Sequence, residues 1–238
     1  MFINKLLFSL YYPYCACLDR LLPSITLDGK KLRVLPGVYK PLDSEHRLAD
    51  LIDEGKEVLD VGCGSGVITL FAAAKSRHVT AIDISPQAIA NTQLNCAQHA
   101  IENVSIRQSD MFREVRGQFD YILSYPPLFQ TSFQSSDKQW CTSTTFVDRL
   151  FSGAREHLKP HGRLLVLLPS IFRESPAELG ARHGLVLERA VPHFHRSLAT
   201  RIHSLPYLHF NMKNHVYIFR PQEDSAAAQS LSEKRSDP

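Results

Sequence analysis

The chain has 238 residues, of which 44% are hydrophobic and 21% are charged. This composition excludes a disordered or fibrous protein, and the length fits one domain, or one with a small appendage, that buries its own core. The net charge of +3 permits an anionic partner but lacks the dense basic character of a dedicated nucleic-acid binder. The five cysteines are odd in number and contain no CxxC pair, which predicts reduced thiols in a cytoplasmic protein.

Residues 1–35 are predicted to form an N-terminal helical segment. Apolar residues between Ile3 and Leu21 recur on one helical face, while Pro13 interrupts the run and no small-residue cleavage site follows it. The run is also too short and too broken to span a bilayer, so we expect no transmembrane segment. The segment is expected to pack on the domain or cover its active site as a lid. Contact with a membrane surface is the lesser alternative.

Beyond residue 50, short apolar runs alternate with amphipathic segments. Strands are predicted at Glu57–Val61, His78–Asp83, Val104–Gln108, Phe119–Ser124, Arg163–Leu168, Leu185–Val191 and His215–Phe219. Helices are predicted at His46–Ile52, Val67–Lys75, Pro86–Ala100, Phe146–Leu158 and Pro176–His183. The alternation indicates an α/β fold with an open, mostly parallel sheet covered on both faces. Residues 222–238 are polar and rich in Ala and Ser, which predicts a disordered tail.

The strongest motif is a strand that runs through a glycine turn directly into a helix, with the sequence D-V-G-C-G-S-G at residues 60–66. Glycines there allow a tight turn and a close approach of the backbone to a ligand. The spacing is not the G-x-G-x-x-G of dinucleotide sites, and the lysine of a P-loop is missing. Asp83 ends the next strand, where a carboxylate can accept hydrogen bonds from two ribose hydroxyls. Asp110 follows the third strand, where it can receive an adenine amino group.

Glycine turns and strand-end acids are common in α/β folds, so the inference depends on their order and spacing together. In that order and spacing they resemble the class I S-adenosylmethionine-dependent methyltransferases. The resemblance spans residues 36–221 and implies a Rossmann-like, doubly wound sheet of seven strands with the last strand antiparallel, and S-adenosyl-L-methionine as the cofactor. The cofactor-binding residues that it implies are Tyr39, Asp60, Gly62, Cys63, Gly64, Gly66, Asp83, Ile84, Asp110 and Met111.

The sequence Tyr125-Pro126-Pro127-Leu128 follows the fourth strand and resembles the N-P-P-Y motif of methyltransferases that modify a planar nitrogen. In that family the Asn side chain and a backbone carbonyl accept the two N–H bonds of an amide or a nucleobase amine. Here Tyr125 replaces the Asn, and Leu128 replaces the aromatic residue, so Phe129 is left to supply the ring. The candidate catalytic residues are Tyr125, Pro126 and Pro127. The alternative is that this turn only ends a strand and shapes the pocket wall.

Upstream, residues 37–45 resemble the P-R-P-E-T-E segment of the release-factor glutamine methyltransferases, the HemK-like group, and of related small-domain methyltransferases. Pro41 and Ser44-Glu45 match that segment, whereas Leu42 stands in place of its Arg. By position, Tyr39 and Ser44 would border the methionine end of the cofactor. Equally, Asp43 or Ser44 could cap the next helix.

Five histidines surround an aromatic-rich stretch before the last strand. His193 and His195 are candidates to contact the acceptor, and either could act as a base if the acceptor carries a removable proton. Their H-x-H spacing alone does not predict a metal, because no Cys or carboxylate cluster completes a site there.

The departures from the family motif at Tyr125 and Leu128 favour methyl transfer to a nitrogen or oxygen of a small or medium-sized acceptor, in specialised metabolism. The alternative keeps the family chemistry, with a protein glutamine or a ribosomal RNA base as the acceptor. The basic balance is compatible with RNA, but no aromatic RNA-binding signature is present. A non-catalytic nucleotide-binding scaffold is least favoured, because the glycine turn and both acids are retained.

Overall fold

The computed structural model describes residues 14, 17, 19–41, 45–127, 145–169, 172, 174–193 and 214–222. Its main sheet has seven strands in the order β5-β4-β3-β6-β7-β9-β8. The strands are β3 (Glu57–Val61), β4 (His78–Asp83), β5 (Val104–Gln108), β6 (Phe119–Ser124), β7 (Leu158–Pro169), β8 (Leu185–His193) and β9 (Asn214–Pro221). Strands β3 to β7 pair in parallel, whereas β9 runs antiparallel between β7 and β8. The predicted seven-stranded sheet with an antiparallel last strand is confirmed.

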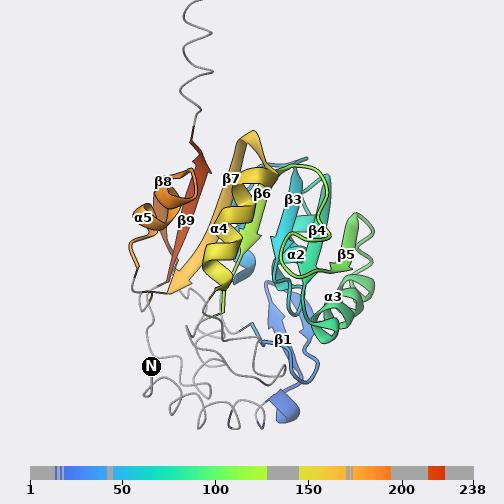
Figure 1. The fold of residues 1–238 in the computed structure, drawn as a ribbon. Helices are drawn as coiled ribbons and strands as arrows, with labels where there is room; N and C mark the ends of the chain where they lie inside the picture. Colours follow the sequence, from blue (N-terminus) through green and yellow to red (C-terminus); the bar gives the residue numbers. More distant parts are fainter. Residues whose placement is uncertain are drawn as a thin grey trace, which may run out of the picture.

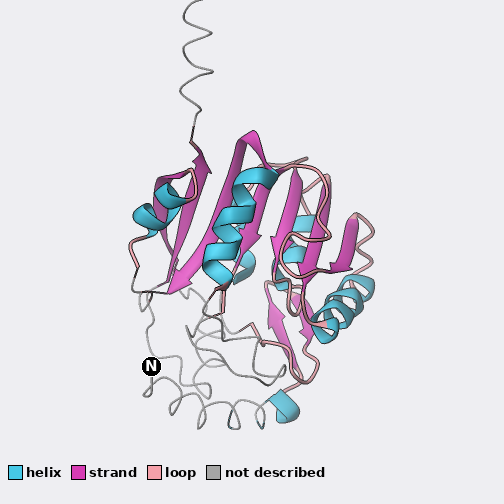
Figure 2. Cartoon of the chain, viewed as in Figure 1, coloured by secondary structure: helices cyan, strands magenta, loops and turns pink. Residues whose placement is uncertain are grey.

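Helices cover both faces of this sheet (Figures 1 and 2). Alternate residues of a strand point to opposite faces, so the central strands β3, β6 and β7 contribute to two separate cores. One core contains Leu59, Ile122 and Leu164 and is covered by α4 (Phe146–His157) and α5 (Pro176–Arg182). The other contains Val58 and Leu165 and is covered by α2 (Val67–Ala73) and the 3-10 helix η1 (Glu45–Leu51).

Local signals account for most element boundaries, which lie within two residues of the predicted ones. Helix α3 (Pro86–Gln98) begins as expected, because the Ser85 hydroxyl accepts a hydrogen bond from the N–H of Ala88 and Pro86 occupies the first turn. Strand β7 is the exception. It begins at Leu158, where the predicted helix would still continue, and not at the predicted Arg163.

Strand β7 starts early because its first residues pair with β6. Leu158 pairs with Phe119, and the register then shifts before Tyr121 pairs with Arg163. The ammonium of Lys159 lies 2.7 Å from the Asp120 carboxylate, which fixes the first residues of β7 beside β6. This long-range pairing overrides the Pro and Gly signals in the sequence.

The segment before residue 36 is not entirely helical, which corrects the prediction of a helical 1–35 region. Residues 24–33 form an antiparallel hairpin of β1 (Ser24–Leu27) and β2 (Lys30–Arg33). Its two turn residues, Asp28 and Gly29, have φ values of 42° and 80°, the left-handed geometry that closes tight hairpins. Buried side chains of the hairpin join the same core as α2 and η1, so it is part of the domain.

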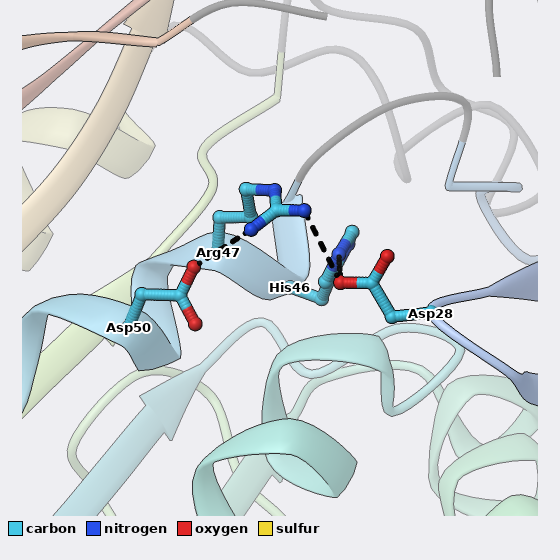
Figure 3. A network of polar contacts seen from close by, with 4 residues as sticks. All are labelled: Asp28, His46, Arg47 and Asp50. Carbon is cyan, nitrogen blue, oxygen red and sulfur yellow. Dashed lines mark hydrogen bonds and ion pairs between the residues drawn. The ribbon is translucent and has the colours of Figure 1, made fainter. Parts of the chain in front are cut away.

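The hairpin turn also contacts two polar side chains on η1 (Figure 3). The Asp28 carboxylate lies 3.0 Å from the His46 ring and 3.3 Å from the Arg47 guanidinium. Arg47 in turn pairs with Asp50 at 3.1 Å. In Figure 1 the hairpin lies at the edge where the parallel strands end.

Among the described residues, no helix has the length and the apolar character needed to cross a membrane. The predicted disordered tail falls outside the described residues from position 223 onward. The same holds for residues 1–13 of the predicted N-terminal helix.

The packing of α5 provides a test of the fold. A Cβ at Gly180 would lie 2.8 Å from the carbonyl oxygen of Leu185 and 2.9 Å from the Phe219 ring. We therefore expect Gly180→Ala to lower the free energy of unfolding by about 1–3 kcal/mol, as overpacked cores do. Helix propensity alone would favour Ala by about 1 kcal/mol. Urea unfolding of Gly180→Ala measures the sign of the change in the free energy of unfolding. Ala181→Gly is the control for helix propensity. A more stable Gly180→Ala protein would contradict the close packing at Gly180.

Candidate functional site

The glycine turn leaves β3 and enters α2 in a conformation that side chains rarely adopt. Gly62, Gly64 and Gly66 have φ values of 81°, 54° and 80°. The N–H groups of Gly62 and Cys63 both donate to the carbonyl of Ile82, at 2.8 and 3.0 Å. A Cβ at Gly66 would lie 3.0 Å from the Cα of Thr92 on α3, so the backbones approach too closely for a side chain. We call residues 62–66 the glycine loop.

Asp83 ends β4 directly beside this loop. One carboxylate oxygen accepts the N–H of Gly64 at 3.0 Å, and the other accepts the N–H of Ser85 at 2.9 Å. A carboxylate can accept about four hydrogen bonds, so both oxygens retain the capacity to bind hydroxyls. Burial raises the pKa of Asp83. Ile84 follows it and is 53% exposed, so its large apolar side chain can pack on a flat ligand surface.

Asp60 lies under the loop and is fully buried. One carboxylate oxygen accepts the Thr69 hydroxyl of α2 at 2.6 Å, while the other has no hydrogen-bond partner among the described residues. Burial raises the pKa of Asp60 to about 7. An unsatisfied buried acceptor is costly, so this oxygen suits a cationic or hydrogen-bond-donating ligand group.

The thiol of Cys63 is buried against helix α3. The Thr92 hydroxyl donates towards the Cys63 sulfur at 3.2 Å and towards the Gly64 carbonyl oxygen at 3.1 Å. Burial raises the pKa of this thiol well above its ordinary value. Cys63 can therefore serve a ligand through its backbone, and its sulfur is part of the packing against α3.

Asp110 follows β5, but the structure gives it a partner that the sequence did not indicate. Its carboxylate pairs with the guanidinium of Arg149 on α4 at 2.8 Å, and this hydrogen bond lowers the pKa of Asp110. Met111 has a φ of 53°, and its carbonyl accepts the Ser109 hydroxyl at 2.6 Å. Helix α4 also places the Phe146 ring 3.5 Å from where a Cβ of Gly62 would lie. Neither Arg149 nor Phe146 was predicted, because only the packing of α4 brings them here.

The turn at Tyr125 lies beside the glycine loop. The Ser124 hydroxyl donates to the Val61 carbonyl at 2.8 Å, which ties the carboxyl ends of β6 and β3 together. The Tyr125 ring meets the Tyr39 ring edge-on, with centroids 5.8 Å apart. The Tyr39 hydroxyl donates to the Glu45 carboxylate of η1 at 3.2 Å. The structure therefore brings Tyr39 and Tyr125 together and adds Glu45, which the sequence had marked only as a motif match.

The remaining acceptor candidates are less well placed. His193 ends β8 at the same edge of the sheet, but three strands along from Tyr125 in the strand order. Only its backbone is described, and Phe129 and His195 lie outside the described residues. Within the described ranges, no group of three or more His, Cys, Asp or Glu side chains could hold a metal ion.

Residues 34–181 match the family model for the methyltransferase small domain. This chain belongs to that family. A putative protein N5-glutamine methyltransferase of Methanocaldococcus jannaschii is 31% identical over 153 residues, covering 63% of this chain and 74% of that protein. The ribosomal RNA small subunit methyltransferase C of Salmonella paratyphi B is 34% identical over 149 residues, covering 60% of this chain. The match spans only 41% of that second relative's length.

Solved structures show the same fold. A methyltransferase from Pyrococcus furiosus superimposes with a TM-score of 0.62 at 20% identity, covering 90% of this chain and 98% of that one. A ribosomal protein L11 methylase from Lactobacillus delbrueckii subsp. bulgaricus gives a TM-score of 0.58 at 16% identity, covering 81% and 86% of the two chains.

The small-domain methyltransferases take S-adenosylmethionine, so the predicted enzyme class and cofactor are confirmed. The residues of this chain fit that cofactor. The open backbone of the glycine loop, the unsatisfied oxygen of Asp60 and the acceptor capacity of Asp83 match its methionine end and its ribose. The individual assignments of the ten cofactor residues remain predictions.

The buried carboxyl of Asp60 should make stability depend on pH. Its pKa of about 7 in the folded chain exceeds the ordinary value of 3.8, so the folded state holds the proton more tightly. This contribution is fully present below about pH 4 and is lost as the pH rises through 7. Asp60→Asn keeps an acceptor for Thr69 but cannot ionise. The variant should therefore gain about 1 kcal/mol or more relative to the wild type between pH 5 and pH 8.

Urea unfolding of both cofactor-free proteins at several pH values measures this difference. The exposed Glu102→Gln variant is the control and should follow the wild-type curve. If the wild-type and Asp60→Asn curves run parallel from pH 5 to pH 8, the carboxyl of Asp60 is not buried as described.

Proposed function

We propose that this methyltransferase transfers the methyl group of S-adenosylmethionine to a planar nitrogen of a macromolecule, with a protein glutamine amide as the first candidate. The observation that supports this most directly is the hydrogen bond between Ser124 and Val61, which joins the Tyr125 turn to the start of the glycine loop. An acceptor seated on that turn would lie next to a cofactor seated on the loop. The named glutamine methyltransferase relative, of which the match covers 74%, supports the same acceptor class.

When bound, the cofactor supplies a methyl group on a positively charged sulfur, and the products are the methylated nitrogen, S-adenosylhomocysteine and a proton. The chain's part is to position and desolvate the acceptor. Pro126 restricts Tyr125 to extended backbone, and the following Pro127 stiffens the turn. The edge-on contact with Tyr39 orients the Tyr125 ring. The phenol oxygen can then accept one N–H of an amide, and a backbone carbonyl of the turn can accept the other.

Cofactor contacts follow from the same geometry. Asp83 would hold the ribose hydroxyls, and the free oxygen of Asp60 would receive the ammonium group of the methionine end. Ile84 and Met111 would enclose the adenine, whose amino group would meet Asp110 in spite of its pairing with Arg149. The three carboxylates would each face a cationic or hydrogen-bond-donating group of the cofactor, and the two apolar side chains would face its flat ring.

A ribosomal RNA base amine is the second candidate acceptor. A curated relative named as an RNA methyltransferase supports it, and so does the net charge of +3. The small-molecule acceptor favoured by the sequence has weaker support, because both curated relatives described here are named for macromolecular acceptors. A cytoplasmic site of action stays a prediction.

Labelling of a cell extract distinguishes these acceptors. Purified enzyme and S-adenosylmethionine carrying a labelled methyl group are added to extract that has been treated with nuclease, with protease or by removal of all macromolecules. We expect the label to survive nuclease and to disappear with protease, and the labelled residue to be an N-methylated glutamine. Asp83→Ala should abolish labelling by weakening cofactor binding. Loss of label with nuclease would select RNA, and label in the small-molecule fraction would contradict the proposal.

The Tyr125 hydroxyl can be tested on the acceptor so identified. Tyr125→Phe removes only the hydroxyl and keeps the ring contact with Tyr39. We expect turnover to fall about tenfold or more, the cost of one useful hydrogen bond in the transition state, while cofactor affinity stays unchanged. Steady-state rates and calorimetric titration with S-adenosylhomocysteine measure the two effects. Full turnover in Tyr125→Phe would leave the residue as a wall of the pocket.

A further inference from the structure

One face of helix α3 is polar and yet completely buried. Asn91, Thr92 and Asn95 each expose 0% of their surface. Buried carboxamides are unusual, and they persist only where their donors and acceptors are satisfied. The partners of these three side chains therefore show what this face of α3 does.

Asn95 bonds to two parts of the chain that lie far apart in the sequence. Its carbonyl oxygen accepts the N–H of Arg33 at 2.9 Å, and its amide nitrogen donates to the carbonyl of Arg33 at 2.8 Å. The same amide nitrogen donates to the carbonyl of Ser65, also at 2.8 Å. Arg33 ends the hairpin strand β2, and Ser65 lies inside the glycine loop. One side chain thus uses both of its donors to hold the hairpin and the loop together.

The two neighbours on the same face each serve only one of these partners. Asn91 accepts the N–H of Leu35 at 2.7 Å and donates to the carbonyl of Arg33 at 2.8 Å, so these bonds reach only the hairpin side. Thr92 donates towards Gly64 and Cys63, so its bonds reach only the loop. The helix therefore contains its own matched controls, because Asn91 and Asn95 share residue type, helix and burial.

The hairpin is itself anchored to η1, as Figure 3 shows through the contacts of Asp28 with His46 and Arg47. Helix η1 also carries Glu45, which bonds Tyr39 beside the Tyr125 turn. Asn95 therefore links the glycine loop, through the hairpin, to the element that borders the acceptor turn.

We propose that Asn95 is a positioning residue of the cofactor site, which holds the glycine loop against the N-terminal hairpin in its binding conformation. The proposal rests on the cofactor lying on the glycine loop. Asn95 does not touch the cofactor; it acts by fixing the carbonyl of Ser65. The backbone there can otherwise rotate, because the glycines on either side adopt many conformations.

The test compares Asn95→Ala with Asn91→Ala in the full chain. Titration calorimetry with S-adenosylhomocysteine should show an affinity about tenfold lower in Asn95→Ala, corresponding to the loss of about one hydrogen bond. Asn91→Ala should bind within twofold of the wild type, although both substitutions remove buried hydrogen bonds and both lower the free energy of unfolding. Equal weakening in the two variants would make the effect one of general stability and would overturn the proposal.

Amide hydrogen exchange on the cofactor-free proteins gives a readout that does not depend on binding. In Asn95→Ala, exchange should accelerate at Arg33 and in the glycine loop, whereas in Asn91→Ala it should accelerate at Leu35 and leave the loop unchanged. Unchanged loop exchange in Asn95→Ala would overturn the proposal. If wild-type protein binds no S-adenosylhomocysteine, the proposal that the cofactor lies on the glycine loop has failed. Amide hydrogen exchange still decides whether Asn95 holds the loop.

If Asn95→Ala does not fold, Asn95→Leu replaces it in both measurements. The Leu side chain is close to Asn in size but can neither donate nor accept a hydrogen bond at any pH. The same weaker binding and faster loop exchange are expected, and wild-type values for both would overturn the proposal.

Discussion

The glycine loop has a defined shape only because buried polar groups bond to its backbone from three sides. Asp83 accepts the N–H of Gly64, and the carbonyl of Ile82 accepts the N–H groups at the start of the loop. On the opposite side, Thr92 and Asn95 of α3 donate to loop carbonyls. Glycines permit the required backbone angles but do not select them, so these bonds determine the conformation that a ligand meets. The sheet, α3 and the hairpin all contribute to that selection.

The electrostatics of the site follow from the same burial. Asp60 and Asp83 both lie in surroundings that penalise a negative charge, and burial raises the pKa of each. Two acids held this way are well suited to a cofactor that carries positive charge, because the incoming cation relieves the cost of ionising them. Asp110 differs, since it is half-exposed and already neutralised by Arg149. Cofactor binding should therefore depend more strongly on charge at the methionine end of the proposed site than at its adenine end.

On the acceptor side, the chain departs from its family at the residue that contacts the substrate in the family pattern. Tyr125 stands where the family motif has an Asn. Its phenol offers one donor and one acceptor group in place of a carboxamide. The contact with Tyr39 and the bond from Tyr39 to Glu45 give this phenol a defined orientation. Family membership thus identifies the reaction, whereas in our proposal the choice of acceptor depends on a pair of tyrosines that the family motif does not describe.

The order of strands and helices, the glycine turn and the strand-end acids could be predicted from the sequence, because each depends on residues close together in the chain. Periodic burial, the Ser85 cap and the positive φ angles of the glycines are local properties. The hairpin also had a local signal, the Asp28-Gly29 pair between two short strands, but the apolar helical pattern before it concealed that signal.

Only the tertiary structure decided which distant groups meet. The bond from Asn95 to Arg33 joins residues 62 positions apart, and that from Arg149 to Asp110 joins residues 39 apart. An asparagine on a helix is usually exposed, and a sequence does not show which residue will bury it. Such contacts depend on how helices and hairpin pack over the sheet, so the sequence by itself determined the cofactor and the reaction class, and the packing decided what holds the site in shape.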